Sequence, residues 1–147
     1  MNPEGKSVRA RHDSAAGRVI LLVEDEPVIL LNLELAAKEL GCVGICACSH
    51  AEAMQKLQEN AHIDAAVLDV QLANDRTSAE IASQLFERSV PFVLHSANLA
   101  RNNDVLEHFS ARLIPKPAAP QRVLAAAIEL TSAHRKAANG PHQTGVH

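Results

Sequence analysis

Five polar residues of the chain each follow a short apolar stretch by one or two positions. They are two neighbouring acids, a third acid, a hydroxyl and a lysine: Glu24, Asp25, Asp69, Ser96 and Lys116. Carboxylates gathered in one cleft repel one another and raise each other's pKa values unless a cation lies between them. A hard divalent cation, above all Mg²⁺, relieves this repulsion and keeps coordination positions for phosphate oxygens. If these residues meet in space, their chemistry is therefore that of a phosphoryl group held beside a magnesium ion.

Asp69 is the candidate nucleophile of this set, because a carboxylate can attack a phosphorus atom and form an acyl phosphate. Lys116 would supply a compact positive charge to one phosphoryl oxygen, and the Ser96 hydroxyl would donate to another. The metal and the lysine would offset the negative charge on the phosphoryl oxygens in the transition state.

The elements that must position these residues alternate along the chain. Apolar stretches predict strands at 19–23, 42–48, 65–68, 90–94 and 111–114. Helical spacing and start or stop residues predict helices at 28–40, 50–60, 77–88, 98–109 and 120–133. This alternation indicates one open parallel sheet with helices on both faces. Because chemistry collects at the carboxyl ends of parallel strands, the five polar residues should share one edge of the sheet.

Local signals support three predicted helix starts and one predicted helix end. Residues 49–52 and 77–80 each read as a capping box, in which a Ser or Thr caps a backbone N–H and a Glu three residues later reaches back. Pro27 suits the first turn of the first helix, and Gly41 is expected to end that helix.

Four segments carry these residues in a recognisable order: VILLVEDEP, AAVLDV, HSA and IPKP. Asp69 lies 44 residues after Asp25, Ser96 follows 27 residues later, and Lys116 follows after 20 more. In motifs, order and spacing, residues 18–132 resemble the receiver domain of response regulators in two-component signalling. The resemblance implies an α/β fold of the flavodoxin-like type, with a doubly wound five-stranded parallel sheet and five helices.

The resemblance also implies roles for the matched acids. Asp69 is similar to the phosphoacceptor, which takes a phosphoryl group from a histidine kinase or histidine phosphotransfer protein. Glu24 and Asp25 match the acidic pair that holds Mg²⁺, directly or through water. The main-chain carbonyl of Gln71 matches the remaining protein ligand, so the implied metal set is Glu24, Asp25, Asp69 and Gln71.

Signal transmission follows from the same resemblance. Ser96 corresponds to the hydroxyl that moves onto the phosphoryl group, and Lys116 to the lysine beside it. Such domains do not turn over a separate product, so we do not expect an enzyme. Few residues follow the last predicted helix, and we therefore expect a stand-alone response regulator that contacts a downstream effector protein of unknown identity. The contact face would combine the fourth helix, the fifth strand and the fifth helix, and we also consider a homodimer through that face.

Three features depart from the family's pattern. Leu113 stands where an aromatic residue is usual, so an inward-moving ring cannot report phosphorylation here. Residues 73–77 replace the usual Pro-x-x-Asp-Gly stretch, and His95 precedes Ser96 where an apolar residue is usual. These departures leave a second hypothesis open, a receiver-fold protein-interaction module that is no longer phosphorylated. A phosphatase is disfavoured, because Gln71 occupies the place of the acid that would protonate a leaving group.

Each candidate also has a purely structural explanation. Acids before a helix complement the helix dipole, Asp69 could be a turn residue, and Lys116 could be an exposed loop lysine. His95 is expected to be a packing residue rather than a ligand or a base. Apolar residues precede Asp69, and a buried carboxylate without a partner is costly. The matching positions of the acids and Lys116 at strand ends therefore favour a functional site.

Composition and charge exclude several functional classes. The 147 residues are 47% apolar, but the apolar stretches are far too short to cross a bilayer, and the N-terminus lacks the apolar stretch of a secretion signal. Three cysteines within seven residues suggest no disulfide framework, which fits a reducing cytoplasm. A net charge of −3, with three Phe and no Trp or Tyr, argues against a nucleic-acid surface.

Charge and composition also divide the chain. Residues 1–17 and 133–147 show no apolar periodicity and are expected to be mobile tails. The receiver domain between them, residues 18–132, is acidic. We therefore expect a cytoplasmic protein with neither nucleic-acid nor membrane partners.

Overall fold

A computed structural model of the chain describes residues 15–72, 78–97, 109 and 111–138. Within these ranges five strands form one sheet: β1 (Val19–Val23), β2 (Val43–Ala47), β3 (Ala65–Leu68), β4 (Phe92–Ser96) and β5 (Arg112–Pro115). Their order is β2-β1-β3-β4-β5, and every neighbouring pair is parallel. The predicted doubly wound parallel sheet is confirmed.

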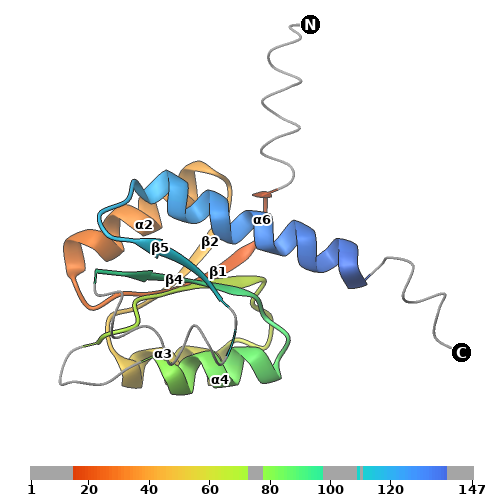
Figure 1. The fold of residues 1–147 in the computed structure, drawn as a ribbon, viewed down its shortest axis with the longest axis horizontal. Helices are drawn as coiled ribbons and strands as arrows, with labels where there is room; N and C mark the ends of the chain where they lie inside the picture. Colours follow the sequence, from red (N-terminus) through yellow and green to blue (C-terminus); the bar gives the residue numbers. More distant parts are fainter. Residues whose placement is uncertain (1–14, 73–77, 98–108, 110, 139–147) are drawn as a thin grey trace, which may run out of the picture.

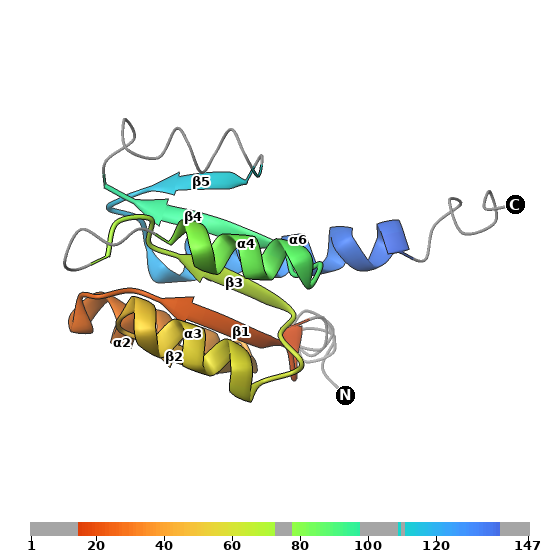
Figure 2. The same cartoon turned by 90° about the horizontal axis from the view of Figure 1, so that it is seen from below.

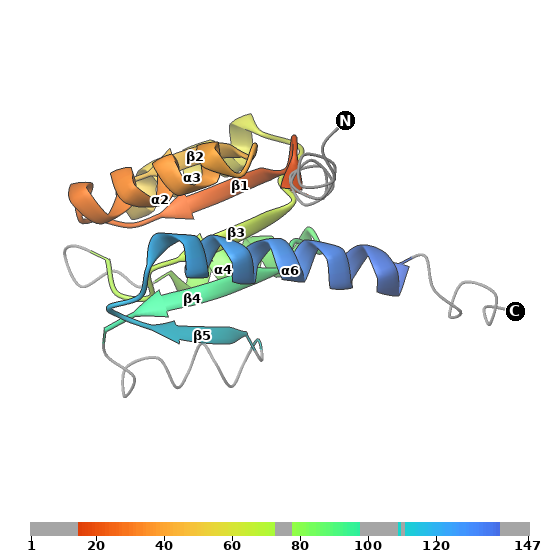
Figure 3. The ribbon, with the colours of Figure 1, turned by 90° about the horizontal axis from the view of Figure 1, so that it is seen from above.

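Helices cover both faces of this sheet. The described ranges contain α2 (Pro27–Glu39), α3 (His50–Glu59), α4 (Ala79–Glu87) and α6 (Pro120–Ala138). Helices α2 and α6 lie side by side on one face (Figure 1 and Figure 3), whereas α3 and α4 cover the other (Figure 2). The helix expected at 98–109 lies outside the described residues except for Phe109.

Successive residues of the central strands pack into opposite layers. In β1, Leu21 and Val23 join the core under α3 and α4, whereas Ile20 and Leu22 join the core under α2 and α6. All four side chains are fully buried, which explains why the strand reads as a continuous apolar run. Each such side chain contributes roughly 1.5–3 kcal/mol through burial, so the core holds the strand ends firmly.

Two predicted helix ends are confirmed by their hydrogen bonds or backbone. Gly41 follows α2 with a φ of 81°, the left-handed conformation that suits glycine after a helix. The Ser49 hydroxyl accepts from the Glu52 N–H at 3.1 Å, as the capping box requires. The Glu52 carboxylate reaches back by one residue more than expected and accepts from the Cys48 N–H at 3.0 Å.

The start of α4 differs from the prediction. The residue that caps this helix is Ser78, and its side chain makes no capping hydrogen bond. The Ser78 N–H instead donates to the Val70 carbonyl at 2.9 Å, which ties the helix start to the segment that follows β3. Residues 73–77, including the Thr that was expected to cap the helix, lie outside the described residues.

Other element boundaries also differ from the predicted ones. Strand β4 begins two residues later than expected and continues to Ser96, which pairs with Pro115 of β5. Helix α6 continues to Ala138, five residues past its expected end. Ala15, in the expected N-terminal tail, is buried, and its carbonyl accepts from the Cys42 thiol at 3.4 Å.

Two further observations concern the whole described part of the chain. The three cysteines are free thiols. No helix in the described ranges is both long and apolar enough to cross a membrane.

Candidate functional site

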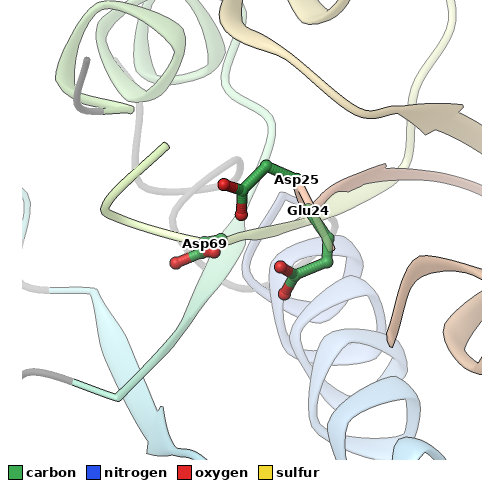
Figure 4. Close-up of side chains that lie close together, drawn as sticks. All are labelled: Glu24, Asp25 and Asp69. Atoms are coloured by element: carbon green, nitrogen blue, oxygen red, sulfur yellow. The ribbon is translucent and has the colours of Figure 1, made fainter. Parts of the chain in front are cut away.

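Three acidic residues lie at the carboxyl ends of two neighbouring strands. Glu24 and Asp25 follow β1, Asp69 follows β3, and the two strands pair with Val23 opposite Leu68. The Asp69 N–H donates to the Val23 carbonyl at 2.9 Å, so the chain leaves both strands at the same level. Figure 4 shows the three acidic side chains gathered at this edge of the sheet.

The three carboxylates are close enough to act as one unit. One oxygen atom from each of Glu24, Asp25 and Asp69 lies within 4.8 Å of the other two. Glu24 is 1% exposed and Asp69 is 5% exposed, whereas Asp25 is half-buried. Water therefore screens little of the repulsion between the two buried carboxylates.

Lys116 brings a positive charge into this cluster. Its Nζ lies 2.8 Å from Glu24 Oε1 and 3.2 Å from Asp69 Oδ2. The lysine directly follows β5, and its main-chain N–H donates to the Ser96 carbonyl at 3.0 Å. Parallel pairing thus carries a residue 47 positions beyond Asp69 to the same edge of the sheet.

The loop after β1 holds Glu24 in place. Glu24 Oε2 accepts from the Glu26 N–H at 3.1 Å, while Oε1 pairs with Lys116. Pro27 occupies the first turn of α2, where its missing N–H costs no hydrogen bond. Both oxygens of Glu24 are therefore engaged within the protein, and a cation at this edge would share Glu24 with the lysine.

Two other predicted site residues lie at the same edge. The Gln71 N–H donates to Asp69 Oδ1 at 3.3 Å, and Gln71 is half-buried. Ser96 is the last residue of β4 and is buried. The roles predicted for the Gln71 carbonyl and the Ser96 hydroxyl stay predictions.

Burial and charge shift the proton affinities of the central pair. Burial and the neighbouring Glu24 raise the pKa of Asp69 to about 7, against the opposing effect of Lys116. Burial acts to lower the pKa of Lys116, but its hydrogen bonds and charge interactions with Glu24 and Asp69 outweigh burial and raise that pKa. The lysine therefore stays protonated at neutral pH, where Asp69 is only partly ionised.

This donor set fits a magnesium ion. Carboxylate oxygens are its preferred ligands, and three of them that lie within 4.8 Å of one another could share one ion. The raised pKa of Asp69 indicates an excess of buried negative charge that a divalent cation would neutralise. Glu24, Asp25 and Asp69 are the residues that would hold the ion.

The pKa of Asp69 predicts how pH affects the metal-free protein. Its folded-state pKa of about 7 lies above its ordinary value of 3.8, so the folded state keeps a proton that the unfolded chain releases. The contribution of Asp69 to the free energy of unfolding is therefore full below pH 4 and falls as pH rises to about 7. Urea unfolding of the wild type and Asp69→Asn at several pH values should show a difference that declines over this range.

The comparison with Asp69→Asn is needed because the titration of His95 changes the free energy of unfolding with pH in the opposite direction. Burial and the Lys116 charge lower the pKa of His95 to about 4, so stability from this residue is lost as pH falls. Subtracting the two pH profiles cancels the His95 effect. A difference that does not change between pH 4 and 7 would contradict the burial of Asp69 beside Glu24.

The residues that depart from the family's sequence pattern lie in different parts of the fold. Leu113 lies in β5, is half-buried and packs against the core under α3 and α4. His95 is buried as expected, in β4. The altered stretch at 73–77 lies outside the described residues.

Comparison with known proteins gives a consistent result for the fold. No protein-family profile and no curated protein sequence matches the chain. Among solved structures, a response regulator receiver protein from Sinorhizobium medicae WSM419 has a TM-score of 0.72 at 24% identity, over 80% of this chain and 97% of that one. The chain folds as a response regulator receiver domain.

Two further structures agree with this receiver fold. A CheY-like response regulator receiver domain protein from Methanospirillum hungatei JF-1 has a TM-score of 0.72 at 20% identity, over 82% of this chain and 98% of that one. SdrG from Sphingomonas melonis Fr1 has a TM-score of 0.64 at 30% identity, over 80% of this chain and 98% of that one. The receiver domain here therefore spans nearly the whole length of each of these relatives.

Proposed function

We propose that this receiver domain accepts a phosphoryl group on Asp69, with Mg²⁺ held by Glu24, Asp25, Asp69 and the Gln71 carbonyl. The donor is a histidine kinase or a histidine phosphotransfer protein in the cytoplasm. The observation that carries the proposal is the Lys116 ammonium, 2.8 Å from Glu24 and 3.2 Å from Asp69 beside a third carboxylate. A purely structural lysine would not require three clustered acids that destabilise one another.

The chemistry is a transfer of one phosphoryl group. A carboxylate oxygen of Asp69 forms a bond to phosphorus as the phosphorus–nitrogen bond of the donor's phosphohistidine breaks. The leaving imidazole keeps the electron pair and takes up a proton, which leaves an acyl phosphate on Asp69 and a free histidine on the donor. The ammonium of Lys116 binds a phosphoryl oxygen, and the bound Mg²⁺ supplies further positive charge to the same group.

Phosphorylation would change the charge at one edge of the sheet without a separate product, so the domain is a stoichiometric acceptor and not an enzyme. The Ser96 hydroxyl, at the end of β4, would donate to the phosphoryl group. The Lys116 N–H donates a hydrogen bond to the Ser96 carbonyl, so the two residues lie side by side and both would respond to a phosphoryl charge on Asp69. An effector protein or a second copy of the chain would bind the phosphorylated state, as in a stand-alone response regulator.

Beryllium fluoride, which mimics a phosphoryl group on a carboxylate, tests this proposal. We expect Mg²⁺ and beryllium fluoride together to cause saturable changes in the amide NMR signals of Asp69, Ser96 and Lys116. Beryllium fluoride without Mg²⁺ should cause none. If the spectrum stays unchanged with both reagents present, the domain is instead an interaction module that is no longer phosphorylated.

A further inference from the structure

A small pocket lies on the α2 and α6 side of the sheet, beside the acidic edge. It has a volume of about 160 Å³ and is lined by α2, by His95 of β4 and by the segment from Lys116 to Pro120. Its apolar wall includes Ile29 and Leu33 of α2. We propose that this pocket binds a small, neutral ring compound carrying one hydrogen-bonding group, which pairs with the His95 imidazole.

The first argument is the state of His95. The residue is 3% exposed, and neither of its ring nitrogens has a hydrogen-bond partner among the described residues. Burial and the Lys116 charge lower the pKa of the ring to about 4, so at neutral pH it is uncharged and offers one donor and one acceptor. A buried polar group without a partner is destabilising, and a hydrogen bond to a ligand group would relieve that cost.

The second argument is the way the ring meets the pocket. No hydrogen bond to the described residues fixes which of its two flipped orientations the ring adopts. The two orientations, related by a half rotation about the Cβ–Cγ bond, exchange each ring nitrogen with a ring carbon and keep nearly the same outline. A ligand group in the pocket could therefore pair with His95 in either orientation, without movement of the backbone.

Size and charge define the class of ligand. A cavity of about 150 Å³ lined by apolar side chains is large enough for benzene, so this pocket suits a single ring with one substituent. The positive charge of Lys116, a residue of the pocket wall, disfavours a cation, and the buried carboxylates of Glu24 and Asp69 that pair with this lysine disfavour an anion. A neutral compound avoids both penalties.

The test uses phenol as the probe and toluene as its match in size, with the metal-free, unphosphorylated protein. NMR titration should show saturable phenol-induced changes at the His95 ring nitrogens and at the methyl groups of Ile29 and Leu33. One hydrogen bond is worth about 0.5–1.5 kcal/mol, so toluene should bind about two- to twelvefold more weakly. The experiment does not involve Asp69 chemistry, so its outcome is independent of the proposed phosphorylation.

Two variants distinguish the contribution of the His95 hydrogen bond from that of the pocket volume. His95→Leu should remove the preference for phenol over toluene, and Ala118→Leu should fill the pocket and abolish binding of both probes. Ala118→Leu keeps His95 and decides the question if His95→Leu does not fold. Equal affinities of the wild type for the two probes, binding at another surface, or retained binding in Ala118→Leu would each overturn the proposal.

Discussion

Asp69→Asn is expected to reduce phosphoryl labelling from acetyl phosphate or a cognate kinase to background while the fold stays intact. The amide has nearly the same shape as the carboxylate but is not a nucleophile toward phosphorus. The substitution also relieves the repulsion with Glu24 and leaves one carboxylate paired with Lys116. At pH 8 without metal, the variant should therefore be more stable than the wild type in urea unfolding, by at most about 4 kcal/mol, because each unit of the raised Asp69 pKa corresponds to about 1.4 kcal/mol.

A matched control separates this result from a general loss of acidic groups. Glu59 is exposed and lies at the last position of α3, outside the acidic cluster. Glu59→Gln should therefore be labelled like the wild type. Labelling of Asp69→Asn at wild-type stoichiometry would show that another residue is the acceptor. A folded but unlabelled Glu59→Gln would show that labelling fails for reasons unrelated to the site.

Asp25→Ala is expected to weaken Mg²⁺ binding strongly, so that Mg²⁺ at levels that saturate the wild type no longer promotes phosphorylation. Asp25 places a carboxylate oxygen within 4.8 Å of those of Glu24 and Asp69, and it is the half-buried member of the three. Loss of a group that supports a metal site commonly weakens affinity by about ten- to a hundredfold, and loss of a direct ligand should do at least as much. Thermal unfolding at increasing Mg²⁺ concentrations measures the Mg²⁺ affinity, because binding to the folded state raises the midpoint temperature of unfolding.

Glu26→Ala is the control for Asp25→Ala, because it removes one carboxylate from the next position in the chain. The main-chain N–H of Glu26, which donates to Glu24, is kept in this variant, and the Glu26 side chain is exposed, so its loss should not matter for the metal. We expect Glu26→Ala to keep nearly wild-type Mg²⁺ affinity, and metal-free Asp25→Ala to be no less stable than the wild type. Equal Mg²⁺ affinities of wild type and Asp25→Ala would contradict the acidic site.

The sequence predicted the edge of the sheet well, for a physical reason. Apolar runs such as 19–23 and 65–68 are buried on both faces, so their ends are sharp and the first polar residue marks the carboxyl end of the strand. Asp69 and Lys116 then meet because parallel strands bring all their carboxyl ends to one side.

Features that depend on packing between elements could not be predicted in the same way. β4 continues to Ser96 because β5 pairs with it there, and the cap of α4 is Ser78 because its N–H bonds the segment after β3. The closer approach of Lys116 to Glu24 than to Asp69 depends on side-chain geometry alone. The pocket beside His95 forms from three separate segments, and none of them carries a local signal for it.

The most direct test of the account is the position of the phosphoryl group after treatment with acetyl phosphate and Mg²⁺. Borohydride reduces an aspartyl phosphate and marks its residue, which peptide mass spectrometry then locates. We predict a single modified position, Asp69, that appears only with Mg²⁺ and is absent from Asp25→Ala at Mg²⁺ levels that saturate the wild type. Modification at any other residue, or at Asp69 to the same extent without Mg²⁺, would contradict the account.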